Sequence, residues 1–364
     1  MSVGRKVLGV AAGAAGMAVA GTAVRVAQQR RMIAHREVDE DLVLGSLHSP
    51  QITVVADDGV PLHAEIDEFD AEAVGGRGRR RTKPAAQPPV TMVFCHGYSL
   101  NLDCWHFQRA AYRGLVRMVF YDQRSHGRSG RSPEAHATIA QLGRDLKRVL
   151  DDLTHDDPVV LVGHSMGGMT IMSLAEQFPE LFGTKVVAAA LISTTAGGLD
   201  PGRILFPMLP AGLGSGLVKR VVGTLSRTHR AVDALRTRGH DVALVITDAY
   251  AFGEGVPEEQ VQFVYDLLNR TPFDVVADFY PAFASLDSWS SCDVLARVPT
   301  SIISGTGDKI TAIGHARKLH ARIHGSDLLE CDGAGHMVIL ERYVQVNAEL
   351  TQLLAAGIER VPEQ

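Results

Sequence analysis

The chain has 364 residues, of which 46% are hydrophobic and 21% are charged, and its formal net charge at pH 7 is −5. A chain of this length and apolar content can bury one large core together with an inserted piece. Because charges of both signs are interleaved along it, the composition argues against nucleic acid as a partner. The 4 cysteines show no disulfide framework, and neither they nor the 15 histidines have the spacing of a metal site.

Residues 1–50 are predicted to form an N-terminal hydrophobic segment and linker. Residues 7–24 carry no charge, and this length is just enough for a membrane span. The basic cluster after this stretch is larger than the one before it. By the positive-inside rule this favours a membrane-associated segment with the rest of the chain in the cytoplasm. Residues 18–20 also fit a signal-peptide cleavage site, so export after cleavage is the alternative. An amphiphilic or partly disordered tail is a third interpretation.

The next part, residues 51–198, shows strands and helices in alternation. Two strands within 51–68 flank the turn signal at 57–59, which predicts a hairpin. Alternation of strand and helix along the rest of this part indicates a mostly parallel, doubly wound sheet with helices on both faces, an α/β fold. Further strands are predicted at 90–95, 116–121, 159–162 and 186–193, and helices at 138–153 and 169–177.

Residues 199–288 break this alternation, because they have helical periodicity and no clear strand. Their place between two sheet strands predicts an inserted helical cap over the carboxyl edge of the sheet. The sheet resumes in residues 289–364, with strands at 300–305 and 327–331 and a helix at 344–356. The chain thus divides into two parts of one core with a cap between them.

The most informative motif is Gly163-His164-Ser165-Met166-Gly167, which lies between a predicted strand and a predicted helix. Small residues on both sides allow a sharp, strained turn that exposes the side chain of Ser165. The first N–H groups of the following helix lack internal partners and can stabilise a developing negative charge. This context describes a nucleophile and half of an oxyanion hole.

A serine hydroxyl needs a base and a third group that orients the base. Asp308 follows the strand at 300–305, and His336 lies in a Gly-rich loop after the strand at 327–331. In a parallel sheet these positions meet Ser165 at one edge. Asp332 is the rival acid, but a residue so near His336 more often accepts hydrogen bonds from its own loop.

Together these motifs resemble the α/β-hydrolase superfamily, in its lipase and esterase branch, over residues 51–359. The sequence His96-Gly97-Tyr98-Ser99 resembles the family's His-Gly loop, and the resemblance implies that the N–H groups of Tyr98 and Met166 form the oxyanion hole. In that family a histidine such as His96 holds the loop. Residues 122–129 resemble the next family loop, in which Asp122 and His126 are expected to be structural. Ser125 stands where glycine is usual.

The predicted function is hydrolysis of carboxylic esters by a Ser165-His336-Asp308 triad through an acyl-enzyme. The apolar residues of the cap suggest an apolar or acyl substrate, a small-molecule ester, and the chemistry needs no cofactor. The same triad would also serve a cofactor-free perhydrolase of haloperoxidase type, a carbon–carbon bond hydrolase or an amidase. A slow-turnover, ligand-binding protein of the same fold is an alternative of another class. The sequence does not indicate an oligomeric state.

Overall fold

The computed structural model describes residues 43–71, 88–199 and 240–361. Over these ranges the strands form one sheet of eight, in the order β1-β2-β4-β3-β5-β6-β7-β8. The strands are β1 (Gln51–Val55), β2 (Pro61–Asp67), β3 (Thr91–Cys95), β4 (Arg117–Tyr121), β5 (Val159–His164), β6 (Val186–Ile192), β7 (Thr300–Gly305) and β8 (Asp327–Cys331).

The sheet is mostly parallel, as the sequence predicts. Strands β1 and β2 form the expected hairpin, with Gly59 in the left-handed region at a φ of 84°. β2 also pairs antiparallel with β4, whereas the neighbours from β4 through β3 to β8 are parallel. The central strands β3, β5, β6 and β7 are buried along their whole length, which explains their nearly continuous apolar runs.

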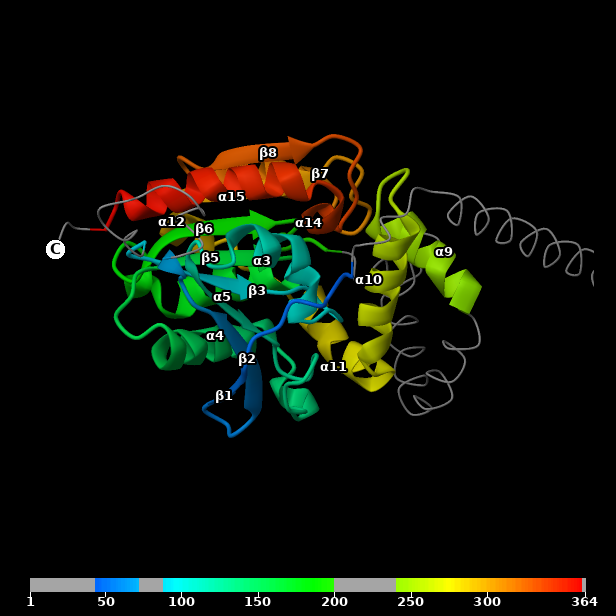
Figure 1. Ribbon diagram of the computed structural model, residues 1–364, viewed down its shortest axis with the longest axis horizontal. Coiled ribbons are helices and arrows are strands. Elements are labelled where there is room, and N and C mark those ends of the chain that lie inside the picture. Colours follow the sequence, from blue (N-terminus) through cyan, green and yellow to red (C-terminus); the bar gives the residue numbers. More distant parts are fainter. Residues whose placement is uncertain (1–42, 72–87, 200–239, 362–364) are drawn as a thin grey trace, which may run out of the picture.

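Helices cover both faces of the sheet (Figure 1). On one face α4 and α5 pack against alternate strand residues such as Val93 and Leu161, and on the other α3 and α15 pack against intervening residues such as Met92 and Val162. The helices of the core are α3 (His106–Tyr112), α4 (Ile139–Leu153), α5 (Met166–Gln177), α12 (Ser291–Leu295), α13 (Gly314–Arg322), α14 (Val338–Glu341) and α15 (Tyr343–Ile358).

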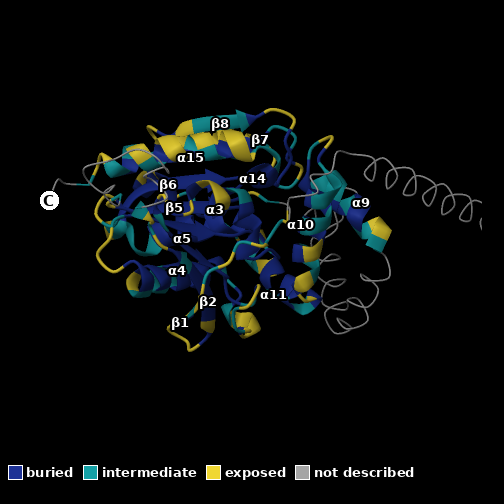
Figure 2. Ribbon diagram, in the orientation of Figure 1, coloured by how far each residue is buried: buried dark blue, intermediate teal, exposed yellow. Residues whose placement is uncertain are grey.

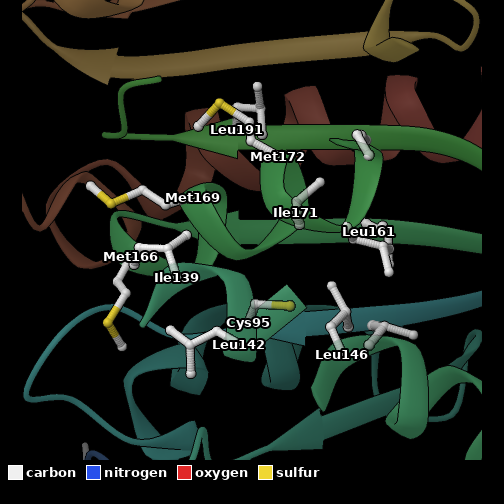
Figure 3. Packing of buried hydrophobic residues seen from close by; sticks show 14 of the residues in the cluster. Cys95, Ile139, Leu142, Leu146, Leu161, Met166, Met169, Ile171, Met172 and Leu191 are labelled. Carbon is white, nitrogen blue, oxygen red and sulfur yellow. The ribbon is translucent and has the colours of Figure 1, made fainter. Parts of the chain in front are cut away.

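Helix α5 is the most deeply buried of these helices, since residues 166–175 are all buried. It lies between the sheet and α4. Helix α4 begins after Thr138, and the hydroxyl of Thr138 accepts a hydrogen bond from the N–H of Gln141 at 3.1 Å. Figure 3 shows side chains of both helices over strands β3, β5 and β6, and Figure 2 shows the buried centre of the sheet. The labelled side chains are Cys95, Ile139, Leu142, Leu146, Leu161, Met166, Met169, Ile171, Met172 and Leu191.

The described part of the predicted cap consists of α9 (His240–Ala251), α10 (Glu258–Arg270) and α11 (Phe273–Ala284). These helices stand beyond the end of the sheet toward which β6 and β8 point (Figure 1). The hydroxyl of Thr271 donates a hydrogen bond to the carbonyl of Ser99 at 3.1 Å, and Arg131 pairs with Asp278 of α11 at 2.7 Å. Residues 200–239, the early part of the predicted cap, lie outside the described residues.

The predicted N-terminal segment at 7–24 also lies outside the described residues, so the anchor and the signal peptide both stay predictions. Among the residues that the structure does describe, no helix is both long and apolar enough to cross a membrane. The four cysteines are free thiols and all are buried. Within the described ranges, no group of three or more His, Cys, Asp or Glu side chains is arranged to hold a metal ion.

Candidate active site

Ser165 forms the corner between β5 and α5. Its backbone has a φ of 52° and a ψ of −114°, a conformation that a residue with a side chain rarely adopts. Such a residue costs on the order of 1–3 kcal/mol, which the surrounding structure must offset. The sequence places the start of the following helix at residue 169, but α5 begins at Met166, directly after the corner. The strained strand-to-helix turn is therefore present as predicted, and it is tighter than expected.

The glycines on either side of Ser165 are required by close backbone contacts. A Cβ on Gly167 would lie 1.9 Å from the carbonyl oxygen of Cys95, and one on Gly163 would lie 2.6 Å from the backbone of Gly167. Both distances are too short for any side chain, and the atoms met are backbone. These contacts press α5 against the end of β3, which fixes the position of Ser165.

The predicted oxyanion residues lie on either side of the serine. Met166 is the first residue of α5, so its N–H has no carbonyl partner within that helix. A Cβ on Gly97 would lie 3.3 Å from Cβ of Ser165, so the loop that carries Tyr98 passes directly beside this serine. The phenol of Tyr98 donates a hydrogen bond to the carbonyl of Val276 in α11. The N–H roles of Tyr98 and Met166 remain predictions.

His96 fixes the shape of this loop, as the family resemblance implies. Its Nδ1–H donates to the carbonyl of Gly97 at 2.7 Å, and its Nε2 accepts from the N–H of Gln123 at 2.9 Å. Burial lowers the pKa of His96 to about 3, so the ring is neutral. A neutral ring with both nitrogens engaged has no free position for proton transfer.

Asp308 and His336 meet as predicted. The Nδ1–H of His336 donates to Oδ2 of Asp308 at 2.8 Å, and the hydroxyl of Thr311 donates to the same oxygen at 2.8 Å. Oδ1 of Asp308 accepts from the N–H groups of Ile310 and Thr311 at 2.8 and 2.9 Å. Burial opposes ionisation, but His336 and these donors outweigh it and lower the pKa of Asp308 to about 2. Asp308 is thus a carboxylate at neutral pH, and it also holds its own loop.

Asp332 makes structural hydrogen bonds, as its position so close to His336 in one loop predicts. Its side chain is exposed, and Oδ1 accepts a hydrogen bond from the hydroxyl of Thr306 at 3.2 Å. The same hydroxyl accepts from the N–H of Gly333 at 2.8 Å. Asp332 therefore links the loop after β8 to the loop after β7, whereas the carboxylate beside His336 belongs to Asp308.

The loop after β4 is held by its own polar side chains. Oδ1 and Oδ2 of Asp122 accept from the N–H groups of Leu102 and Arg128, each at 2.8 Å. Nδ1–H of His126 donates to the carbonyl of Arg124 at 2.9 Å. Ser125, at the position where glycine is usual, has a φ of 65°, the left-handed region that favours glycine. Asp122 and His126 thus hold this loop through hydrogen bonds, which agrees with the structural role expected for them.

The sequence alone indicates no role for His164, which precedes Ser165. Its Nε2–H donates to the backbone carbonyl of His336 at 3.0 Å, so it ties the elbow to the histidine loop. Burial lowers the pKa of His164 to about 3, and the ring is therefore uncharged. His164 is visible in the sequence as part of the Gly163–Gly167 motif, but its partner, His336, lies 172 residues away. Only the folded chain brings the two together.

Ser165 and His336 both line one cavity of about 450 Å³ between the sheet edge and the cap helices. Each of these two residues is 7% exposed, so both are largely covered by protein but still accessible from the cavity. The rest of the lining is mainly apolar and comes from α5, α9, α10 and α11 and from loops at the end of the sheet, including residues 97–100 and 310–311. It includes Met169, Ile246, Val264, Leu268, Val276 and Phe283.

A comparison with family models matches residues 92–349 to the alpha/beta hydrolase family. The chain belongs to this family. An uncharacterized protein of Mycobacterium tuberculosis (strain ATCC 25618 / H37Rv) is 28% identical over 272 residues, which cover 71% of this chain and 73% of that protein. The match to the α/β-hydrolase model confirms the resemblance on which the fold prediction rests.

Solved structures of α/β-hydrolase proteins show the same fold. The enol-lactonase from Burkholderia xenovorans LB400 superposes with a TM-score of 0.63 at 22% identity, covering 84% of this chain and 100% of that one. An esterase from Exiguobacterium antarcticum gives a TM-score of 0.63 at 18% identity, with coverages of 85% and 100%. At these identities the likeness establishes the fold of this α/β hydrolase.

Proposed function

We propose that this α/β hydrolase cleaves carboxylic esters of apolar or acyl compounds, with Ser165 as nucleophile, His336 as base and Asp308 as the group that orients His336. The observation that carries the proposal is the pairing of Asp308 with His336 at a cavity that the strained Ser165 also lines. A strained serine, an oriented imidazole and an apolar cavity together are what acyl transfer needs.

In the proposed mechanism, Nε2 of His336 takes the proton of Ser165 as its oxygen attacks the ester carbonyl. The N–H groups of Tyr98 and Met166 stabilise the negative charge on the tetrahedral intermediate. His336 then gives its proton to the leaving alcohol, and the acyl group stays on Ser165. Water repeats the sequence on the acyl-enzyme and releases the acid.

The orientation of His336 follows from the donors around Asp308. A carboxylate oxygen at 2.8 Å from Nδ1 keeps the proton on that nitrogen and leaves Nε2 free to accept one. It also stabilises the imidazolium that forms when His336 takes the serine proton. The hydrogen bonds from Ile310 and Thr311 keep the carboxylate in place during this step.

The cavity supports the proposed substrate class. A volume of about 450 Å³ lies within the range of roughly 300–1,000 Å³ typical of small-molecule sites. Apolar side chains from α10 and α11, such as Val264, Leu268 and Phe283, face this space. An apolar acyl chain or alcohol would be transferred from water to this lining, which lowers the free energy of the bound transition state.

A series of p-nitrophenyl esters of increasing acyl length tests this substrate class. Each buried methylene contributes about 0.8 kcal/mol, so kcat/KM is expected to rise about fourfold per added methylene until the cavity is filled. Matched p-nitroanilides, which present an amide in place of the ester, should turn over more slowly. Turnover of the acetyl ester with none of the longer chains would contradict an apolar substrate, and faster cleavage of the anilides would favour an amidase.

A further inference from the structure

The loop that carries His336 is in direct backbone contact with the segment at the end of α9. A Cβ on Gly253 would lie 2.0 Å from the carbonyl oxygen of Gly333, and a Cβ on Gly335 would lie 2.3 Å from the backbone of Phe252. The N–H of Met337 donates to the carbonyl of Ala251 at 2.8 Å. Glycine on both sides therefore allows two backbones to touch, one from the cap and one from the histidine loop.

One carboxylate bridges these two backbones. Oε1 of Glu341, the last residue of α14, accepts from the N–H of Gly335 at 2.7 Å, and its Oε2 accepts from the N–H of Gly253 at 3.0 Å. Burial raises the pKa of Glu341, whereas the two N–H groups favour its ionised form, in which hydrogen bonds are roughly twice as strong as those between neutral groups. Gly335 is the residue before His336, so this bond fixes the backbone from which the imidazole extends.

Glu341 does not itself line the cavity, whereas Ala251 and Met337 on either side of the junction do. Its effect on a reaction at Ser165 would therefore pass through His336. On the other side of the loop, His164 holds the carbonyl of His336 at 3.0 Å. The histidine backbone is thus held between the nucleophile elbow and a carboxylate that also holds the cap.

We infer that Glu341 is a positioning residue for His336, and that its second hydrogen bond, to Gly253, couples the placement of α9 to the reach of the imidazole. The inference rests on the proposed function, in which His336 is the base. General-base catalysis requires the ring within hydrogen-bond reach of the serine, and a misplacement of about 1 Å can cost 10²-fold in rate. A carboxylate that sets the residue before the base can control that distance.

A merely structural role for Glu341 makes a different prediction. If the carboxylate only stabilised α14 and its neighbours, its removal would lower the melting temperature but leave kcat per folded molecule unchanged. A positioning role predicts a fall in kcat with little change in KM, because the cavity that binds the substrate keeps its lining. The split between kcat and KM therefore separates the two roles.

The test compares two variants of Glu341 in the full-length protein, with kcat and KM measured on one p-nitrophenyl ester. Glu341→Leu removes both acceptors, and we expect kcat to fall about 10²-fold with KM changed less than about threefold. Glu341→Gln keeps one carbonyl acceptor but turns an NH₂ toward the other N–H group. We expect it to restore part of the lost kcat.

Two further variants complete the design. Gly253→Ala leaves the carboxylate intact but pushes the cap segment away from Gly333, and kcat should fall in the same way. Glu349→Gln is the matched control, because Glu349 is also half-buried and accepts a hydrogen bond from the hydroxyl of Ser301 at 2.7 Å, on α15 instead of α14. Its kcat should equal that of the wild type.

The inference is overturned if Glu341→Leu and Glu341→Gln both keep wild-type kcat, whatever their melting temperatures. If Glu341→Leu does not fold, the decision rests on Glu341→Gln and Gly253→Ala, and wild-type kcat in both again overturns it. Absence of ester turnover in the wild-type protein is a separate result. It would overturn the proposed function, and with it the role that His336 needs for this inference.

Discussion

Replacing Ser165 with alanine is expected to lower kcat for ester hydrolysis by on the order of 10³- to 10⁶-fold. The proposed acyl-enzyme needs an oxygen at this position, and alanine supplies none. Binding and the N–H groups of Tyr98 and Met166 would remain, so KM should change little. Steady-state kinetics on the best ester of the series, with the enzyme concentration high enough to detect slow turnover, measures both constants.

Ser193 provides the control for this variant. It is buried and has a φ of 46°, so its backbone is strained like that of Ser165, but it does not line the cavity. Ser193→Ala should fold as the wild type does and keep its kcat. Retention of wild-type kcat by Ser165→Ala would refute the nucleophile. Equal losses in both variants would show that the effect comes from folding.

Replacing Asp308 with asparagine is expected to lower kcat by about 10⁴-fold. The N–H groups of Ile310 and Thr311 require an oxygen at the Oδ1 position, so the NH₂ group of the amide would face Nδ1 of His336. Nδ1 would then act as acceptor, and the proton would move to Nε2. A protonated Nε2 cannot take the proton of Ser165, although the geometry of the site is nearly unchanged.

The same variant predicts a change in acid stability. Because the pKa of Asp308 is lowered from 3.8 to about 2, its carboxylate contributes stability that is present above pH 3.8 and is lost as pH falls toward 2. Asp308→Asn should therefore lose stability at neutral pH and differ less from the wild type near pH 2, as chemical unfolding at several pH values would show. For the predicted loss of kcat, Asp332→Asn is the matched control. A larger loss of kcat in Asp332→Asn than in Asp308→Asn would contradict the assignment of Asp308 as the acid that orients His336.

Much of the fold follows from local patterns in the sequence. Buried parallel strands appear as continuous apolar runs, and the hairpin appears as two strands around Gly59. Positions at strand ends place Ser165, Asp308 and His336 at one edge once the sheet is known to be parallel. The choice of Asp308 over Asp332 follows from the same rule, because Asp308 ends a different strand and Asp332 shares the loop of His336.

Other features depend on distant partners that no local pattern shows. Glu341 looks like an ordinary charged residue at a helix end, and its role emerges only where Gly253 and Gly335 meet. His164 likewise depends on a carbonyl far along the chain. Helix α13 has only two buried residues, Ala316 and Leu319, so its apolar periodicity is too weak to predict a helix from the sequence.

The sequence also predicts how the chain divides into domains. The division at residues 198 and 288 rests on where sheet alternation stops and resumes, and it stays a prediction. Helices α9, α10 and α11 agree with helical periodicity in the second half of the predicted cap. Acyl length and leaving group depend on the shape of the cavity between these helices and the sheet, which patterning of single elements does not specify.

Labelling with a fluorophosphonate probe, followed by peptide mapping, tests the activated serine most directly. Such a probe reacts with a serine whose hydroxyl is deprotonated by a neighbouring base, and no substrate needs to be known. We expect stoichiometric modification of the wild-type protein at Ser165, slow modification of Asp308→Asn and none of Ser165→Ala. An unlabelled wild-type protein, or a label on a different serine, would contradict a nucleophile at this corner of the sheet.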